Sequence, residues 1–506
     1  MKVVAGKDLL VKVNVTTTTP AEALPDGTLV VTNAAGTTLA TLPLNKPTGG
    51  VGSSVPARPD MALAYTARLT AGTVAAGIKL SASLTGNGQA ATVATPVVQV
   101  APHIRIVAVP IAYADDANGT PGRVGVPLPA ATVQTGFLDR APLAQVTYEI
   151  RSTPIALDYP RGTAGKDTLA DILALMVKER TADPDKTLPL YYSGTHYGPN
   201  GGGLGYMPGY ANSLGDWGGN ANNMLGTFLH EHGHNFSVHH APACIGTAGF
   251  DASFPYDGGM LGNAARAITP FFMSQGLTQA LVDPTAQTDR MGYCFPAARA
   301  LSDYSFMKAF NYLSTQFVKE GKSAAQVQDL IYLSGTFETN GTVTFNPVEG
   351  LTGVADSAQT GDWSVRITAT SGRVYTYPIE IKELSHAPER HFTIAVPNPG
   401  PLVAVELINT QQQVVKRQAT TLAKAASTQS TGVQWSEANG RMVATWDTQA
   451  FSQVVVKWIK DGRSVTLTNP RQGGSLSVNT RTLGAGGEFE FSLSDGLNTT
   501  RVRYRR

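Results

Sequence analysis

Five of the nine histidines lie in one short stretch, LHEHGHNFSVHH, between residues 230 and 240. His230, Glu231 and His234 form an H-E-x-x-H pattern. Residues four apart on a helix lie on one face, so the two histidines can bind a single metal ion. Histidine pairs at this spacing typically hold Zn²⁺, and a neighbouring carboxylate can take a proton from water beside the metal. The pattern therefore indicates a zinc centre with Glu231 as its general base.

A further histidine, His240, lies six residues beyond His234, where the pattern H-E-x-x-H-x-x-G-x-x-H has its third ligand. Three histidines leave one tetrahedral position open for water, which is typical of catalytic zinc. His239 is the alternative ligand. Neighbours in an extended segment point to opposite sides, so only one of the two can bind, and we favour His240. His232 lies on another side of the helix from His230 and is expected to pack or hydrogen-bond inside the protein. A coincidental histidine-rich tract is the competing interpretation.

The longer segment HEHGHNFSVHHAPAC, followed by FPYDGG, DRMGYC and SDYSF, resembles the metzincin metallopeptidases. Within them it looks like the secreted bacterial StcE-type group, which includes mucin-degrading proteases with accessory β-domains. The resemblance covers about residues 225–310. It implies a secreted zinc endopeptidase acting on extracellular proteins, including O-glycosylated or mucin-like glycoproteins.

The resemblance also implies roles for residues downstream of the histidines. Met291 would pack beneath the metal in a Met-turn, which is compatible with ordinary core packing. Tyr293 would bind zinc or stabilise the transition state, and core packing is its equal alternative. Metzincins usually have glycine where this chain has Ser237, because the backbone turns there with a positive φ angle. A non-glycine residue in that conformation costs about 1 kcal/mol or more.

Two further expectations follow from the resemblance. Cys244 and Cys294, the only cysteines of the chain, lie four residues past His240 and three past Met291. If both segments converge near the zinc, a disulfide bond between them is reasonable, and it would indicate an oxidising compartment. The glycine-rich stretch 201–209 resembles the edge strand of the metzincin cleft, to which an extended substrate would add as another strand. A mobile surface loop is the alternative.

The hydrophobic pattern predicts the elements that must position these residues. The motif should lie on a helix over about 222–235, and a second helix should follow Asp167, which can cap it. The apolar, β-branched run 104–111 predicts a buried strand. A third helix is expected over about 302–317.

On this basis we expect an α+β metzincin-like zinc protease domain flanked by all-β sandwich domains. The expected boundaries are an N-terminal β-sandwich at 1–101, the catalytic domain at 102–322, a β-domain at 323–425 and a C-terminal β-sandwich at 426–506. If the last two domains only target or bind, a fragment ending near residue 322 should still cleave a small peptide.

Composition limits the remaining function classes. The 506 residues carry a net charge of +2 and only 15% charged side chains, which argues against a dedicated nucleic-acid binder. No apolar run reaches the ~18 residues of a transmembrane span. We expect a secreted or cell-surface protein whose signal peptide has been removed. The rivals to the peptidase are a surface adhesin or glycan-binding protein with an inactive zinc centre, and a zinc hydrolase with a non-peptide substrate.

Overall fold

The computed structural model divides into two compact units. The first unit comprises Met1–Ile104, Ala131–Thr147 and Phe236–Lys319, and the second comprises Arg105–Ala130, Tyr148–Asn235 and Glu320–Arg506. The residues described are 2–18, 23–55, 61–85, 92–100, 102–116, 118–242, 250–262, 287–293, 300–320, 326–356, 359–419, 432–461 and 463–506.

The first unit begins with short strands around one apolar core. Strand β3 alternates buried and half-buried residues, and its Leu29 and Val31 share one core with Leu80 of the paired strand β6 and Tyr65 of the second sheet. The sheets have the orders β4-β3-β6-β7, β2-β5 and β1-β8. The strands are β1 (Lys2–Val4), β2 (Leu9–Val13), β3 (Gly27–Thr32), β4 (Thr38–Leu44), β5 (Tyr65–Leu69), β6 (Lys79–Leu84), β7 (Thr92–Ala94) and β8 (Val97–Gln99). Helices α1 (Ala130–Arg140) and α4 (Asp303–Glu320) lie mainly in the same unit.

The second unit is built on an eleven-stranded sheet. Its order is β10-β9-β12-β14-β13-β20-β21-β15-β16, with β11 paired to β9 and β17 paired to β15. Strands β9, β12 and β14 are parallel, whereas β13 and the strands beyond it pair antiparallel. The bounds are β9 (His103–Ala112), β10 (Gln145–Ile150), β11 (Ile155–Ala156), β12 (Leu190–His196), β13 (Gly203–Met207), β14 (Ala211–Gly215), β15 (Val327–Phe337), β16 (Val343–Phe345), β17 (Glu349–Val354), β20 (Lys382–Leu384) and β21 (Arg390–Pro397).

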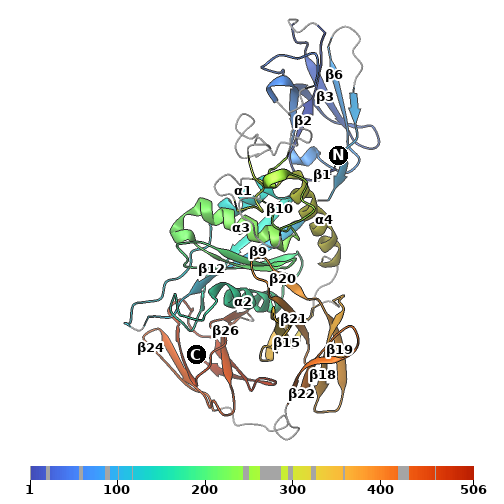
Figure 1. Cartoon of the computed structure of the whole chain (residues 1–506). Helices are drawn as coiled ribbons and strands as arrows, with labels where there is room; N and C mark the ends of the chain where they lie inside the picture. The colour runs from blue at the N-terminus through green and yellow to red at the C-terminus, as the bar shows by residue number, and fades with distance from the viewer. Residues whose placement is uncertain are drawn as a thin grey trace. The chain divides into compact units, whose positions relative to one another are not determined.

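Helices α2 (Thr168–Ala182) and α3 (Ala221–Asn235) pack against the strands at the centre of this sheet (Figure 1). As the sequence predicts, Asp167 caps α2, its side chain accepting the N–H of Ala170 at 3.1 Å. The α2 face of the sheet includes Val107, Leu204 and Tyr206, which share one core with the helix. Side chains alternate along a strand, so Gly203 and Gly205 of β13 face the other way, towards α3.

The rest of the second unit consists of smaller antiparallel sheets. The first of them shares an apolar core with β15 and β21 of the main sheet, and the other two share a second core. Their orders are β19-β18-β22-β23, β24-β25-β28 and β27-β26-β29-β30. The strands are β18 (Trp363–Ala369), β19 (Val374–Ile379), β22 (Leu402–Ile408), β23 (Val414–Ala419), β24 (Gln434–Ala438), β25 (Arg441–Thr445), β26 (Gln453–Lys460), β27 (Arg463–Thr466), β28 (Ser475–Asn479), β29 (Glu488–Ser494) and β30 (Thr499–Arg505).

The fold class expected from the sequence is wrong. Strands contain about 42% of the described residues and helices about 16%, so the chain is mostly β rather than an α+β metzincin-like domain flanked by sandwiches. The main sheet also continues across residue 322, because β13 pairs with β20, which leads through β21 to β15. Hydrophobic periodicity indicates which segments are helical or extended, but it does not report which distant strands pair.

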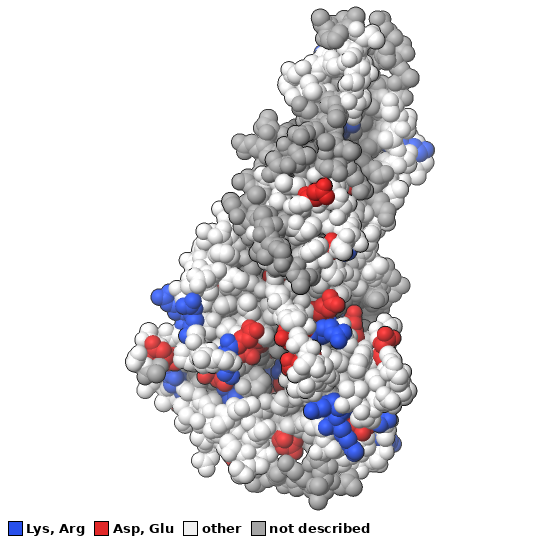
Figure 2. All heavy atoms as spheres, in the orientation of Figure 1, with Lys and Arg blue, Asp and Glu red and all other residues white. Residues whose placement is uncertain are grey.

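On the face drawn in Figure 2, the described acidic and basic side chains are interspersed rather than gathered by sign. None of the helices in the described residues is long and apolar enough to cross a membrane.

Candidate metal centre

Both ends of helix α3, which carries the H-E-x-x-H motif, are held in place. At its start, the Asn220 side chain accepts the N–H of Asn223 at 3.1 Å, which satisfies a helix donor that has no partner within the helix. At its end, the Asn235 side chain donates to the carbonyl oxygens of Tyr206 and Ala211, both at 2.9 Å. These bonds join the last turn of the helix to β13 and to the start of β14. The part of α3 that carries the motif is therefore held against the sheet.

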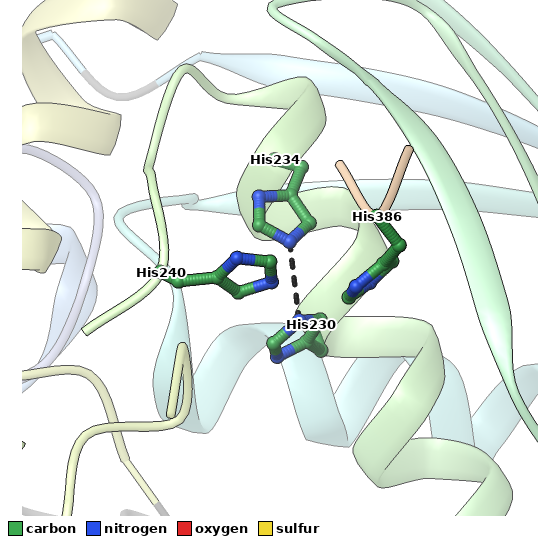
Figure 3. Close-up of side chains that lie close together, drawn as sticks. All are labelled: His230, His234, His240 and His386. Carbon is green, nitrogen blue, oxygen red and sulfur yellow. Dashed lines mark hydrogen bonds between the residues drawn. The ribbon is translucent and has the colours of Figure 1, made fainter. Parts of the chain in front are cut away.

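His230 and His234 are almost completely buried, with 3% and 0% of their surface exposed. Their Nε2 atoms lie 3.1 Å apart. Zinc–nitrogen bonds of about 2.0–2.1 Å in a tetrahedral arrangement place two ligand nitrogens about 3.3 Å apart, so the pair fits one zinc ion. His240 and His386 complete a group in which one ring nitrogen from each histidine lies within 4.8 Å of the others (Figure 3). An all-imidazole donor set suits zinc better than calcium or magnesium.

The two other residues expected near the metal, Met291 and Tyr293, contact the segment around His240. The hydroxyl of Tyr293 lies 3.0 Å from Nε2 of His240, so its observed partner is this imidazole. Met291 is fully buried, and its carbonyl accepts the N–H of Ala241 at 3.0 Å. The carboxylate of Asp289 accepts the N–H of Met291 at 2.8 Å and fixes the turn. The expected Cys244–Cys294 disulfide lies outside the described residues.

The structure also describes Ser237 and His232, and it confirms the packed environment expected for His232. Ser237 has a φ of 68°, the left-handed conformation in which the sequence pattern favours glycine. His232 is buried on another side of the helix, where its Nδ1 lies 2.8 Å from the Phe228 carbonyl oxygen and its ring packs on Phe228. Burial lowers the pKa of His232 to about 4, so this imidazole is neutral near pH 7. His232 is therefore packed and hydrogen-bonded inside the protein.

The carboxylate of Glu231 lies between α3 and a segment that sequence reasoning missed. Glu231 is only 1% exposed. Its Oε2 accepts the Ser385 hydroxyl at 3.1 Å, and its Oε1 lies 3.1 Å from Nε2 of His386, which donates because a carboxylate only accepts. Ser385 and His386 are 154 and 155 residues away in the chain. An isolated serine–histidine pair after a short strand carries no local signal, so only the strand pairing reveals its place.

The glycine-rich stretch forms strand β13, but this strand is not at an edge of the sheet as expected, because β20 covers it. The glycines of β13 allow the Glu231 carboxylate to approach the strand backbone. A Cβ atom at Gly203 would lie 2.5 Å from Oε1 of Glu231, and one at Gly205 would lie 3.2 Å from Oε2. The absence of side chains at these positions creates the space that the Glu231 carboxylate occupies.

Replacing Gly203 by alanine should therefore displace the Glu231 carboxylate while leaving the histidines in place. If Glu231 is the general base that the motif predicts, kcat should fall by about tenfold at unchanged zinc content, because misplacing a catalytic group by about 1 Å can cost up to 10²-fold. Gly205→Ala is the matched control and should have the smaller effect, since its methyl group meets looser contacts. Equal rates for Gly203→Ala and the parent would show that Glu231 tolerates the displacement.

Comparisons with known proteins assign no family to this chain. No family model and no curated protein matches it. Among solved structures, it is similar to a two-domain fibronectin type-III segment from chicken tenascin at 9% identity and a TM-score of 0.15, covering 36% of this chain and 96% of that one. A pullulanase from Anoxybacillus sp. LM18-11 matches at 9% identity and a TM-score of 0.13, covering 35% and 25% of the two chains. A Parabacteroides merdae beta-glucuronidase matches at 10% identity and a TM-score of 0.14, covering 99% and 75%. Scores this low establish neither fold nor function.

Proposed function

We propose that this protein is a zinc-dependent endopeptidase. The observation that supports this most directly is the buried arrangement on α3, where His230 and His234 bring their Nε2 atoms to 3.1 Å and Glu231 lies between them in sequence. His240 would supply the third nitrogen. Two imidazoles from one helix and a carboxylate from the same turn are the groups that metal-assisted hydrolysis of a peptide bond requires.

The protein side of the mechanism centres on Glu231. Zinc, when bound, would supply a Lewis acid that polarises the scissile carbonyl and makes water acidic enough to attack. The Glu231 carboxylate takes the proton from the attacking water as its oxygen bonds to the carbonyl carbon. Glu231 then delivers that proton to the amide nitrogen as the carbon–nitrogen bond breaks, which yields one carboxylate and one amine. The backbone that carries His230 and His234 is held in place, because α3 is anchored at both ends.

The substrate class rests on the resemblance of the segment that begins at His230 to secreted mucin-degrading enzymes. We therefore propose extracellular proteins, including O-glycosylated ones, as substrates of a secreted or cell-surface enzyme.

A second candidate is a surface adhesin or glycan-binding protein with an inactive zinc centre. The fourth imidazole, His386, favours it, because four protein ligands around zinc are typical of structural sites and leave no position for water. The two functions share one site and differ in whether that site turns over a substrate.

Incubating the full chain with casein and with a mucin, each with and without a zinc chelator, tests the proposal. We expect new peptide termini, detected by mass spectrometry, only in the samples without chelator, and recovery when zinc is restored. Chelator-insensitive cleavage would contradict a metal-dependent mechanism. Zinc binding with no cleavage of either substrate would favour the adhesin, or a hydrolase for another class of compound.

A further inference from the structure

The edge of β13 is occupied by the chain itself. Strand β20 runs antiparallel to it, with Tyr206 opposite Leu384 and Met207 opposite Glu383. The pairing extends to Ser385, whose N–H donates to the Gly205 carbonyl at 2.9 Å and whose hydroxyl accepts the Gly205 N–H at 2.9 Å. An extended peptide that added to β13 would need these same backbone groups.

Where the pairing with β13 ends, the chain turns towards Glu231 and the histidine cluster. Ser385 and His386 both bond to the Glu231 carboxylate, one to each oxygen. The His386 ring also stacks on that of His230, with centroids 5.5 Å apart and planes inclined by 16°. Figure 3 shows this ring beside His230 and His234, carried by a separate segment. One short segment therefore contacts the strand edge, the base and the imidazole cluster.

We propose that residues 382–386 fill the position in which an extended substrate would bind, and that His386 closes the metal centre as a fourth histidine ligand. The inference rests on the proposed function and concerns how that same site is regulated. In the closed state the edge of β13 is paired with β20 and Glu231 is hydrogen-bonded on both oxygens. Because Nε2 of His386 donates to Glu231, His386 would offer its Nδ1 to the metal. Cleavage requires Ser385 and His386 to leave.

The structure of the segment suits partial displacement. Leu384 is 7% exposed and belongs to the core on the α2 face of the sheet, so it anchors the start of the segment. The His386 side chain is 22% exposed, against 1% for Glu231, and the exposed Pro388 follows two residues later. A movement beginning at Ser385 therefore frees the base and the metal without unpacking Leu384.

Replacing His386 by alanine tests the proposal with two measurements. The first is the affinity of acetohydroxamate, a small zinc ligand, for the zinc-loaded full chain, measured by calorimetry. The second is the rate of casein cleavage. We expect the His386→Ala variant to bind acetohydroxamate at least about tenfold more tightly than the parent, because apparent affinity falls with the fraction of molecules whose site is open. Cleavage should accelerate by a similar factor.

Glu383→Ala is the matched control, because Glu383 lies on the same strand with an exposed side chain and pairs through its backbone. It should behave like the parent in both measurements. Unchanged or weaker acetohydroxamate binding by His386→Ala would overturn the inference. Slower cleavage would also overturn it and would make His386 a positioning residue for Glu231. If neither protein cleaves casein but His386→Ala gains acetohydroxamate affinity, the closure stands and the peptidase function fails.

Discussion

Replacing Glu231 by glutamine should lower kcat by about 10²–10⁴-fold, the usual contribution of general-base assistance, while zinc content remains near one ion per chain. Glutamine keeps the shape of the buried side chain and can still bond to Ser385 and His386, so folding should be near native. It has no basic carboxylate and cannot take the proton of the attacking water. The loss should therefore fall on turnover rather than on metal binding.

His234→Ala should behave differently from Glu231→Gln. His234 is fully buried and is one of the two ligands that α3 contributes, whereas His240 and His386 lie outside the helices and named strands. Ligands on a helix are held more precisely than ligands on loops, so losing one should reduce zinc well below one ion per chain and abolish cleavage. Atomic absorption, kcat and thermal denaturation on both variants separate the two effects. A Glu231→Gln protein that cleaves as fast as the parent would refute the mechanism.

A fragment that ends at residue 322 should not fold to the native second unit. It lacks β15, β20 and β21, which pair in succession beyond β13 in the main sheet. Their loss leaves the edge of β13 without its partner strand and removes the Leu384 side chain from the core around Leu204. An exposed strand edge of this kind promotes aggregation. We therefore expect the strands after residue 322 that belong to the main sheet to be needed for the fold of this unit.

The fragment and the full chain should be compared by gel filtration, circular dichroism, zinc content and cleavage of a small unglycosylated peptide. We expect aggregated or poorly folded fragment with no stoichiometric zinc and no cleavage, beside a folded full chain. A monomeric, zinc-loaded fragment that cleaves the peptide would show that residues before 322 build a complete site. That result would also show that Ser385 and His386 are not required to hold Glu231.

Several local features could be predicted from the sequence because their causes are local. The apolar spacing and the cap at Asp167 predict α2, and the region expected to be helical at 222–235 is α3 over Ala221–Asn235. The i, i+4 spacing alone places His230 and His234 on one face. At Ser237, where the resembling family has glycine, the sequence left open whether the turn is remodelled, and the structure keeps the positive φ.

The pairing of strands that are far apart in the sequence decided the fold class and the remaining site residues. The sequence indicated that 201–209 could form a strand, but nothing in those residues specifies that β20, more than 170 positions later, pairs with it. Backbone hydrogen-bonding groups are the same in every residue, so a strand's partner is selected by burial and by the closure of the whole sheet, not by a local pattern. For that reason the predicted fold class failed while the motif helix was correct. Ser385 and His386 could not be identified as site residues from the sequence for the same reason. Only the completed sheet brings them into contact with Glu231.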